Sequence, residues 1–114
     1  MNKLFGISNC DTVRKAKKWL EANHVDFEYI DFRKNDFSED HIQNWLQKVS
    51  FEDIVNQRSQ AWKGLTDDQK RDLIAHKQIA LLLETPTLIK RPVLHTSETL
   101  LFGFKEAQYQ TQFA

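Results

Sequence analysis

The sequence has few of the residues that give small proteins unusual architectures. Its 114 residues include one cysteine, two prolines and three glycines. A single cysteine excludes an intramolecular disulfide, so the chain must depend on a hydrophobic core, for which this length is sufficient. The fractions of apolar (40%) and charged (28%) residues are ordinary and indicate one globular domain over residues 1–114.

The sequence also lacks an excess charge and a long hydrophobic run. Sixteen basic residues balance sixteen acidic residues, so composition gives no reason to expect nucleic acid or an anionic membrane as a partner. No apolar run approaches the ~20 residues of a membrane span, and no signal peptide is visible. Together with the cysteine count, these absences predict a cytoplasmic protein.

The only cysteine lies at a junction between two predicted elements. Residues 3–7 are an apolar run typical of a buried strand, and from Asp11 onward apolar residues recur at helical spacing. Cys10 is therefore expected at a helix N-terminus, where free N–H groups and the helix dipole would stabilise a thiolate. A lone cysteine is often only a small buried hydrophobe, but this position favours a nucleophile.

The first helix is followed by signals for a parallel strand pair. Asn23 and His24 are predicted to end the helix, with Asn tolerating the left-handed cap. Residues 27–31 read as a second strand, which should be parallel to the first because a helix connects them. The polar break at residues 33–36 then ends this βαβ unit.

The remainder of the chain predicts a helical segment and a closing ββα unit. Capping-box spacings open two of the helices, and the proline at position 86 ends the helical segment. The two later strands are joined by four residues and should pair antiparallel. In chain order the pattern predicts helices at 38–49, 50–55, 66–76 and 79–84, strands at 92–95 and 100–104, and a helix at 105–113.

These elements add up to an α/β fold, a four-stranded mixed sheet of the thioredoxin-like type with an inserted helical subdomain. Residues 1–34 and 86–114 would form the thioredoxin-like core and residues 35–85 the insertion. Four ordered motifs then carry a family resemblance: GISNCDTVRKA at 6–16, NQRS at 56–59 with WKGL at 62–65, PTLIKRPV at 86–93, and LFGF at 101–104. Together they resemble the arsenate reductase (ArsC)/Spx family, and within it the small YffB-like branch.

The resemblance implies a set of site residues. Cys10 would be the nucleophilic thiol, and Arg58 and Arg91 match arginines that surround the oxyanion in glutaredoxin-linked arsenate reductases. Arginine suits such an anion because it stays charged and offers a fork of donors. The bond between Arg91 and Pro92 matches the cis bond of thioredoxin-like folds. The further binding residues implied by the first motif are Asn9, Asp11 and Thr12.

Two departures from the arsenate reductase pattern bear on the substrate, and a third departure, from the Spx pattern, bears on a disulfide switch. Arsenate reductases of this type have a third arginine after the final hairpin, but no arginine follows Arg91 here, and Lys105 is not an equivalent. Asp11, directly after Cys10, opposes a thiolate and an incoming oxyanion. Both departures argue against strict arsenate specificity. Val13 stands where Spx regulators often carry a second cysteine, which excludes their disulfide switch.

With one thiol, the predicted chemistry has a fixed outline. The thiolate of Cys10 would attack a small oxyanion or a disulfide, and an external thiol must resolve the adduct. Glutathione, as co-substrate, or a glutaredoxin is the expected supplier, and no tightly bound cofactor or metal is expected because the four histidines show no ligand spacing. The alternative is a non-catalytic Spx-like protein that binds RNA polymerase or another protein partner.

Overall fold

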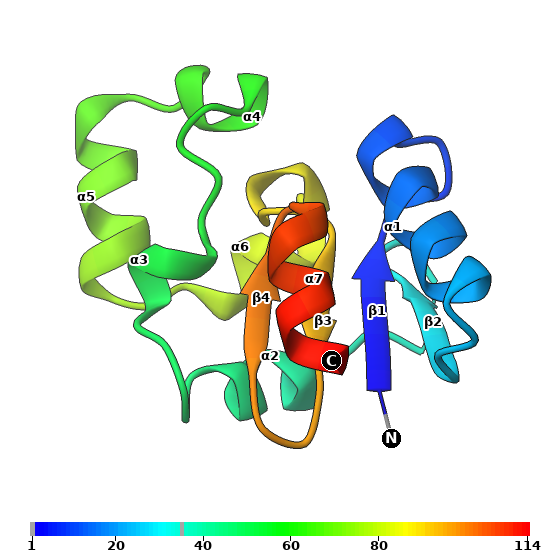
Figure 1. Cartoon of the computed structure of the whole chain (residues 1–114). Coiled ribbons are helices and arrows are strands. Elements are labelled where there is room, and N and C mark those ends of the chain that lie inside the picture. The colour runs from blue at the N-terminus through cyan, green and yellow to red at the C-terminus, as the bar shows by residue number, and fades with distance from the viewer. Residues whose placement is uncertain (1, 35) are drawn as a thin grey trace. The chain divides into compact units, whose positions relative to one another are not determined.

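The computed structural model describes residues 2–34 and 36–114. Met1 and Asn35 lie outside the described residues, so the predicted polar break and the predicted start of the insertion at 35 are described only in part. In chain order (Figure 1) the elements are β1 (Asn2–Gly6), α1 (Asp11–Ala22), β2 (Phe27–Asp31), α2 (Glu39–Trp45), α3 (Phe51–Ile54), α4 (Gln60–Lys63), α5 (Asp67–Ala75), α6 (Ile79–Glu84), the 3₁₀ helix η1 (Pro86–Leu88), β3 (Val93–His95), β4 (Leu100–Phe102) and α7 (Glu106–Phe113).

The chain divides into two compact units. The first contains residues 1–37 and 91–114, and the second contains residues 38–90. In the part of the chain that the structure describes, no helix combines the length and the apolar character that crossing a membrane requires.

The first unit contains a four-stranded mixed sheet with the strand order β2-β1-β3-β4. β1 pairs parallel with β2 and antiparallel with β3, and β3 pairs antiparallel with β4. This topology confirms the predicted parallel βαβ unit and the predicted antiparallel hairpin, and with them the thioredoxin-like sheet.

Helix α1 packs on this sheet through one apolar face. Val13, Ala16 and Leu20 are fully buried, as helical periodicity predicts. The core continues through Leu4 of β1 and Tyr109 of α7, and Trp19 meets the ring of Tyr109 edge-on with the centroids 5.6 Å apart. This packing fixes the direction of α1, and Figure 1 shows its first turn beside the arrowhead of β1.

A close approach between β1 and α1 makes Gly6 sensitive to substitution. A Cβ built on Gly6 would lie 2.5 Å from Cγ2 of Val13, closer than real Cβ atoms come. We therefore expect Gly6→Ala to lower the free energy of unfolding by about 1–3 kcal/mol, the usual scale of core overpacking. Urea denaturation measures this loss. Gly64→Ala is the matched control, since its Cβ would meet nothing closer than 3.5 Å; equal stability of the two variants would contradict the prediction.

At the end of α1, the prediction that Asn23 adopts the left-handed conformation is wrong. The left-handed residue is His24, with φ 57°, whereas Asn23 has φ −98°. Asn23 remains tied to the helix because its backbone N–H and its side-chain amide both donate to the carbonyl of Trp19, at 3.1 and 2.8 Å. The chain therefore reverses one residue later than predicted, and the N–H of Val25 closes the turn on Leu20.

The second unit consists of short helices with well-formed N-termini. Reciprocal capping boxes at Ser38, Ser50 and Thr66 open α2, α3 and α5, which confirms the last two as predicted from their spacing. Helix α2 ends at Trp45 rather than at 49, and turns continue its apolar pattern. Helix α4 was not predicted, because four residues are too few for a periodic pattern; its signal is the Ser59 cap, whose hydroxyl accepts from Trp62 N–H at 3.1 Å.

Candidate functional site

Cys10 is the N-cap residue of α1, which confirms its predicted place between a strand and a helix. β1 ends at Gly6, and Cys10 has an extended backbone (φ −98°, ψ 126°) before the helix begins at Asp11. Its own N–H donates to the carbonyl of Ile7 at 3.1 Å, which closes the connecting turn. The thiol is half-buried, so it is neither a core residue nor freely solvated.

The surroundings of Cys10 favour its thiolate. Burial by itself raises the pKa of Cys10, because it disfavours the charged form. Hydrogen bonds from the backbone N–H groups of Val13 and Thr12, and the hydrogen bond and positive charge of Arg91, act in the opposite direction and outweigh it. The net result is a pKa below the ordinary value of a cysteine. At a given pH near neutrality, a larger share of Cys10 is therefore the nucleophilic thiolate than in an ordinary cysteine.

Arg91 lies on the chain just before β3, and its peptide bond to Pro92 is cis. The guanidinium group hydrogen-bonds the thiolate of Cys10. Its Nε and Nη1 atoms are buried without a hydrogen-bond partner among the described residues. Buried donors without partners are costly, so the N–H groups on these two nitrogens would gain hydrogen bonds from an anionic ligand with more than one oxygen. Arg91 and Cys10 belong to the same compact unit.

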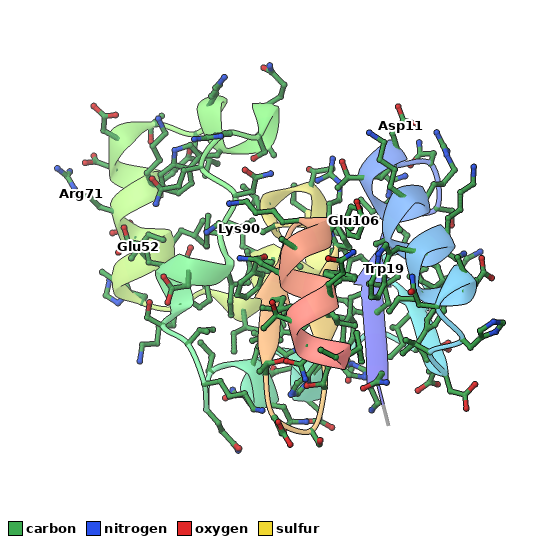
Figure 2. All side chains as sticks on the ribbon, viewed as in Figure 1. Asp11, Trp19, Glu52, Arg71, Lys90 and Glu106 are labelled. Atoms are coloured by element: carbon green, nitrogen blue, oxygen red, sulfur yellow. The ribbon has the colours of Figure 1, made fainter. Side chains whose placement is uncertain are left out.

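The residues that flank Cys10 have distinct environments. Thr12 is half-buried and contributes its backbone N–H to the thiolate. Asp11 is exposed and forms an ion pair with Arg14 of the same helix turn. Figure 2 shows Asp11 at the solvent-facing start of α1. Asn9 is exposed on the connecting turn.

Arg58 belongs to the second compact unit, so its predicted place at the Cys10 site stays a prediction. It is exposed and lies in a turn built on Asn56, whose side-chain oxygen accepts from the N–H of Arg58 at 3.1 Å. The same turn is closed by Ser59, whose hydroxyl donates to the Asn56 carbonyl at 2.7 Å.

A buried carboxylate beside the Cys10 loop was missed by sequence reasoning. Asp31 ends β2 and is only 8% exposed. Its Oδ2 accepts from the hydroxyl of Ser8 at 2.5 Å and its Oδ1 accepts from the N–H of Arg33 at 2.8 Å. Burial raises the pKa of Asp31, but these bonds and the charge of Lys34 lower it below the ordinary value. An ionised carboxylate therefore lies next to the loop that carries Cys10.

A signal for this carboxylate was present in the sequence. The predicted parallel pairing of the first two strands brings their carboxyl ends to one edge of the sheet, where α/β proteins commonly bind ligands. In the register, Gly6 lies opposite Asp31 and Leu4 lies opposite Tyr29. Burial, together with the charges of Asp31 and Cys10, raises the pKa of Tyr29, so its phenol stays neutral in this surrounding.

The loop and the end of β2 together line a hollow of about 220 Å³. We call it the β2-end hollow. Its lining residues are Ile7, Ser8, Asn9, Asp31, Arg33 and Lys34.

Comparisons with known proteins find similarity along almost the whole chain. Residues 5–112 match the ArsC family. An uncharacterised protein of Haemophilus influenzae is 35% identical over the full length of both chains. The global transcriptional regulator Spx of Streptococcus pyogenes serotype M3 is 30% identical over 108 residues, which are 93% of this chain and 80% of the regulator. Among solved structures, an arsenate reductase (ArsC) related protein of Brucella melitensis has a TM-score of 0.75 and 33% identity, with 98% of this chain and 93% of the other covered.

Proposed function

The chain belongs to the ArsC family, and on that premise we propose that it is a glutathione-coupled thiol oxidoreductase with Cys10 as its nucleophile. The observation that carries the proposal is the held thiolate: two backbone N–H groups and the Arg91 guanidinium lower the pKa of Cys10. A cysteine that served only as a buried core residue would not need groups that stabilise its thiolate.

The proposed reaction proceeds in two thiol–disulfide exchanges. The Cys10 thiolate attacks the glutathione sulfur of a mixed disulfide, forms a new S–S bond, and releases the other sulfur as a thiolate that takes a proton from water. A second glutathione thiolate then attacks the sulfur of the bound glutathione. The two glutathione molecules leave joined as oxidised glutathione, and the Cys10 thiolate is restored. The electrons balance, because one disulfide is reduced and one is formed.

The resolving thiol must come from outside the chain, since Cys10 is the only cysteine. Glutathione itself, or a glutaredoxin acting with it, is the proposed supplier. Arg91 would hold a carboxylate of glutathione or the oxygens of a small oxyanion with its unpartnered N–H groups. No arginine follows Arg91 in the sequence, so a substrate limited to arsenate is not proposed.

The second candidate is a non-catalytic protein that binds RNA polymerase or another protein partner. The observation in its favour is the 30% identity to proteins named global transcriptional regulator Spx. In this case Cys10 would be dispensable. The lowered pKa of Cys10 favours the enzyme, because a docking surface does not need an activated thiol.

Intact-mass analysis after exposure to oxidised glutathione tests the proposal. We expect the wild-type chain to gain the mass of one glutathione and to lose it again when reduced glutathione is added. Cys10→Ser is the control for the site, and it should gain nothing. A wild-type chain that stays unmodified at neutral pH under excess oxidised glutathione would overturn the proposed function.

A further inference from the structure

The β2-end hollow lies beside the proposed nucleophile within one compact unit. Ile7, Ser8 and Asn9 line it and directly precede Cys10 in the chain. A short branch of a molecule joined to the sulfur of Cys10 could therefore extend into this hollow.

The hollow combines a buried negative group with two positive groups. Asp31 is held ionised at its wall, and its carboxylate accepts hydrogen bonds from the hydroxyl and the backbone N–H of Ser8 and from the N–H of Arg33. A carboxylate has about four lone-pair sites, so Asp31 retains capacity for a donor from a ligand. Arg33 and Lys34 also line the hollow, and both are exposed.

This charge pattern fits a ligand that carries an ammonium and a carboxylate on one carbon. The ammonium would donate to Asp31, and the carboxylate would bind Arg33 and Lys34. A ligand group with a carboxylate alone would add a second negative charge beside Asp31 without an ammonium to offset it, which is unfavourable. The hollow therefore discriminates between the two ends of glutathione, of which only the γ-glutamyl end carries both groups.

We propose that the β2-end hollow binds the γ-glutamyl amino-acid group of glutathione while its sulfur reacts with Cys10. The proposal rests on the proposed function and assigns one end of its co-substrate. Asp31 is the ammonium partner, Arg33 and Lys34 are the carboxylate partners, and Ser8 is a positioning residue that holds the Asp31 carboxylate at 2.5 Å.

The test compares disulfides that differ in the group offered to the hollow. The rate at which Cys10 forms a mixed disulfide is measured by intact mass with oxidised glutathione, oxidised γ-glutamylcysteine, oxidised cysteinylglycine and 2-hydroxyethyl disulfide. We expect the two γ-glutamyl disulfides to react at least roughly tenfold faster than the other two, because one charge-assisted contact already has about this effect and the hollow is proposed to make two. Equal rates for all four would overturn the assignment of the hollow.

Variants then assign the preference to named residues. In the double variant Arg33→Gln/Lys34→Gln, and separately in Asp31→Asn, the ratio of the rate with oxidised γ-glutamylcysteine to that with 2-hydroxyethyl disulfide should fall about tenfold. Lys18→Gln, an exposed lysine of α1, is the matched control and should keep the wild-type ratio. An unchanged ratio in both site variants would overturn the hollow proposal alone. Absence of any mixed disulfide in the wild type would instead overturn the proposed function and the hollow with it.

Discussion

Cys10→Ser is expected to remove the reduction of a glutathione mixed disulfide, with a loss on the order of 10³-fold or more, the scale on which loss of a nucleophile acts. A serine hydroxyl does not ionise near neutral pH and forms no disulfide, so neither exchange step can occur. The measurement is steady-state turnover of the mixed disulfide of glutathione and 2-mercaptoethanol in the presence of excess glutathione.

The control for this variant is a measurement that it still folds like the wild type. Serine is nearly the size of cysteine and suits an N-cap position, so the thermal unfolding of Cys10→Ser should match that of the wild type. Retained turnover in a folded Cys10→Ser protein would contradict the enzyme. If the wild type and Cys10→Ser also capture the same partner equally from a lysate, the non-catalytic binding protein is the remaining hypothesis.

Most of the sheet could be predicted because its signals are local. A short apolar run, a helical pattern from Asp11 and a second run at 27–31 predict a βαβ unit, and the crossover connection leaves only a parallel pairing. The antiparallel pairing of the last two strands could be predicted because only four residues connect them. The helix ends were less predictable, because the choice between Asn23 and His24 as the left-handed residue depends on a side-chain bond to Trp19.

The candidate site was predictable only where one segment builds it. The N-terminal position of Cys10 follows from the pattern of residues 3–20. The bond between Ser8 and Asp31 joins residues 23 positions apart, and neither residue is unusual in its own segment. Arg91 lies still further along the chain, and it was assigned to the site through the family resemblance rather than through any periodicity.

Arg91→Gln tests the second half of the site and should change both the ionisation of Cys10 and the binding of anions. Glutamine keeps hydrogen-bonding capacity but removes the charge, so the pKa of Cys10 should rise. The midpoint of iodoacetamide alkylation against pH then moves to higher pH. Rates therefore fall most at low pH and converge with the wild type once both thiols are ionised. The wild-type midpoint itself should lie below the ~8.5 of free cysteine.

The loss of anion binding in Arg91→Gln is expected independently of the thiol. Removing a charge-assisted contact from buried donors should weaken the affinity for a thiol-free glutathione analogue by about 1.5–3 kcal/mol, measured by calorimetry at a fixed pH. Arg71→Gln is the matched control, because Arg71 is exposed and forms an ion pair within its own helix, with Asp68. If Arg91→Gln shifts the pH midpoint of Cys10 alkylation but leaves the affinity for the glutathione analogue unchanged, Arg91 activates the thiol and does not bind the anion. If neither quantity differs from that of Arg71→Gln, Arg91 has no part in the site, and the held thiolate would depend on the backbone N–H groups of α1 alone.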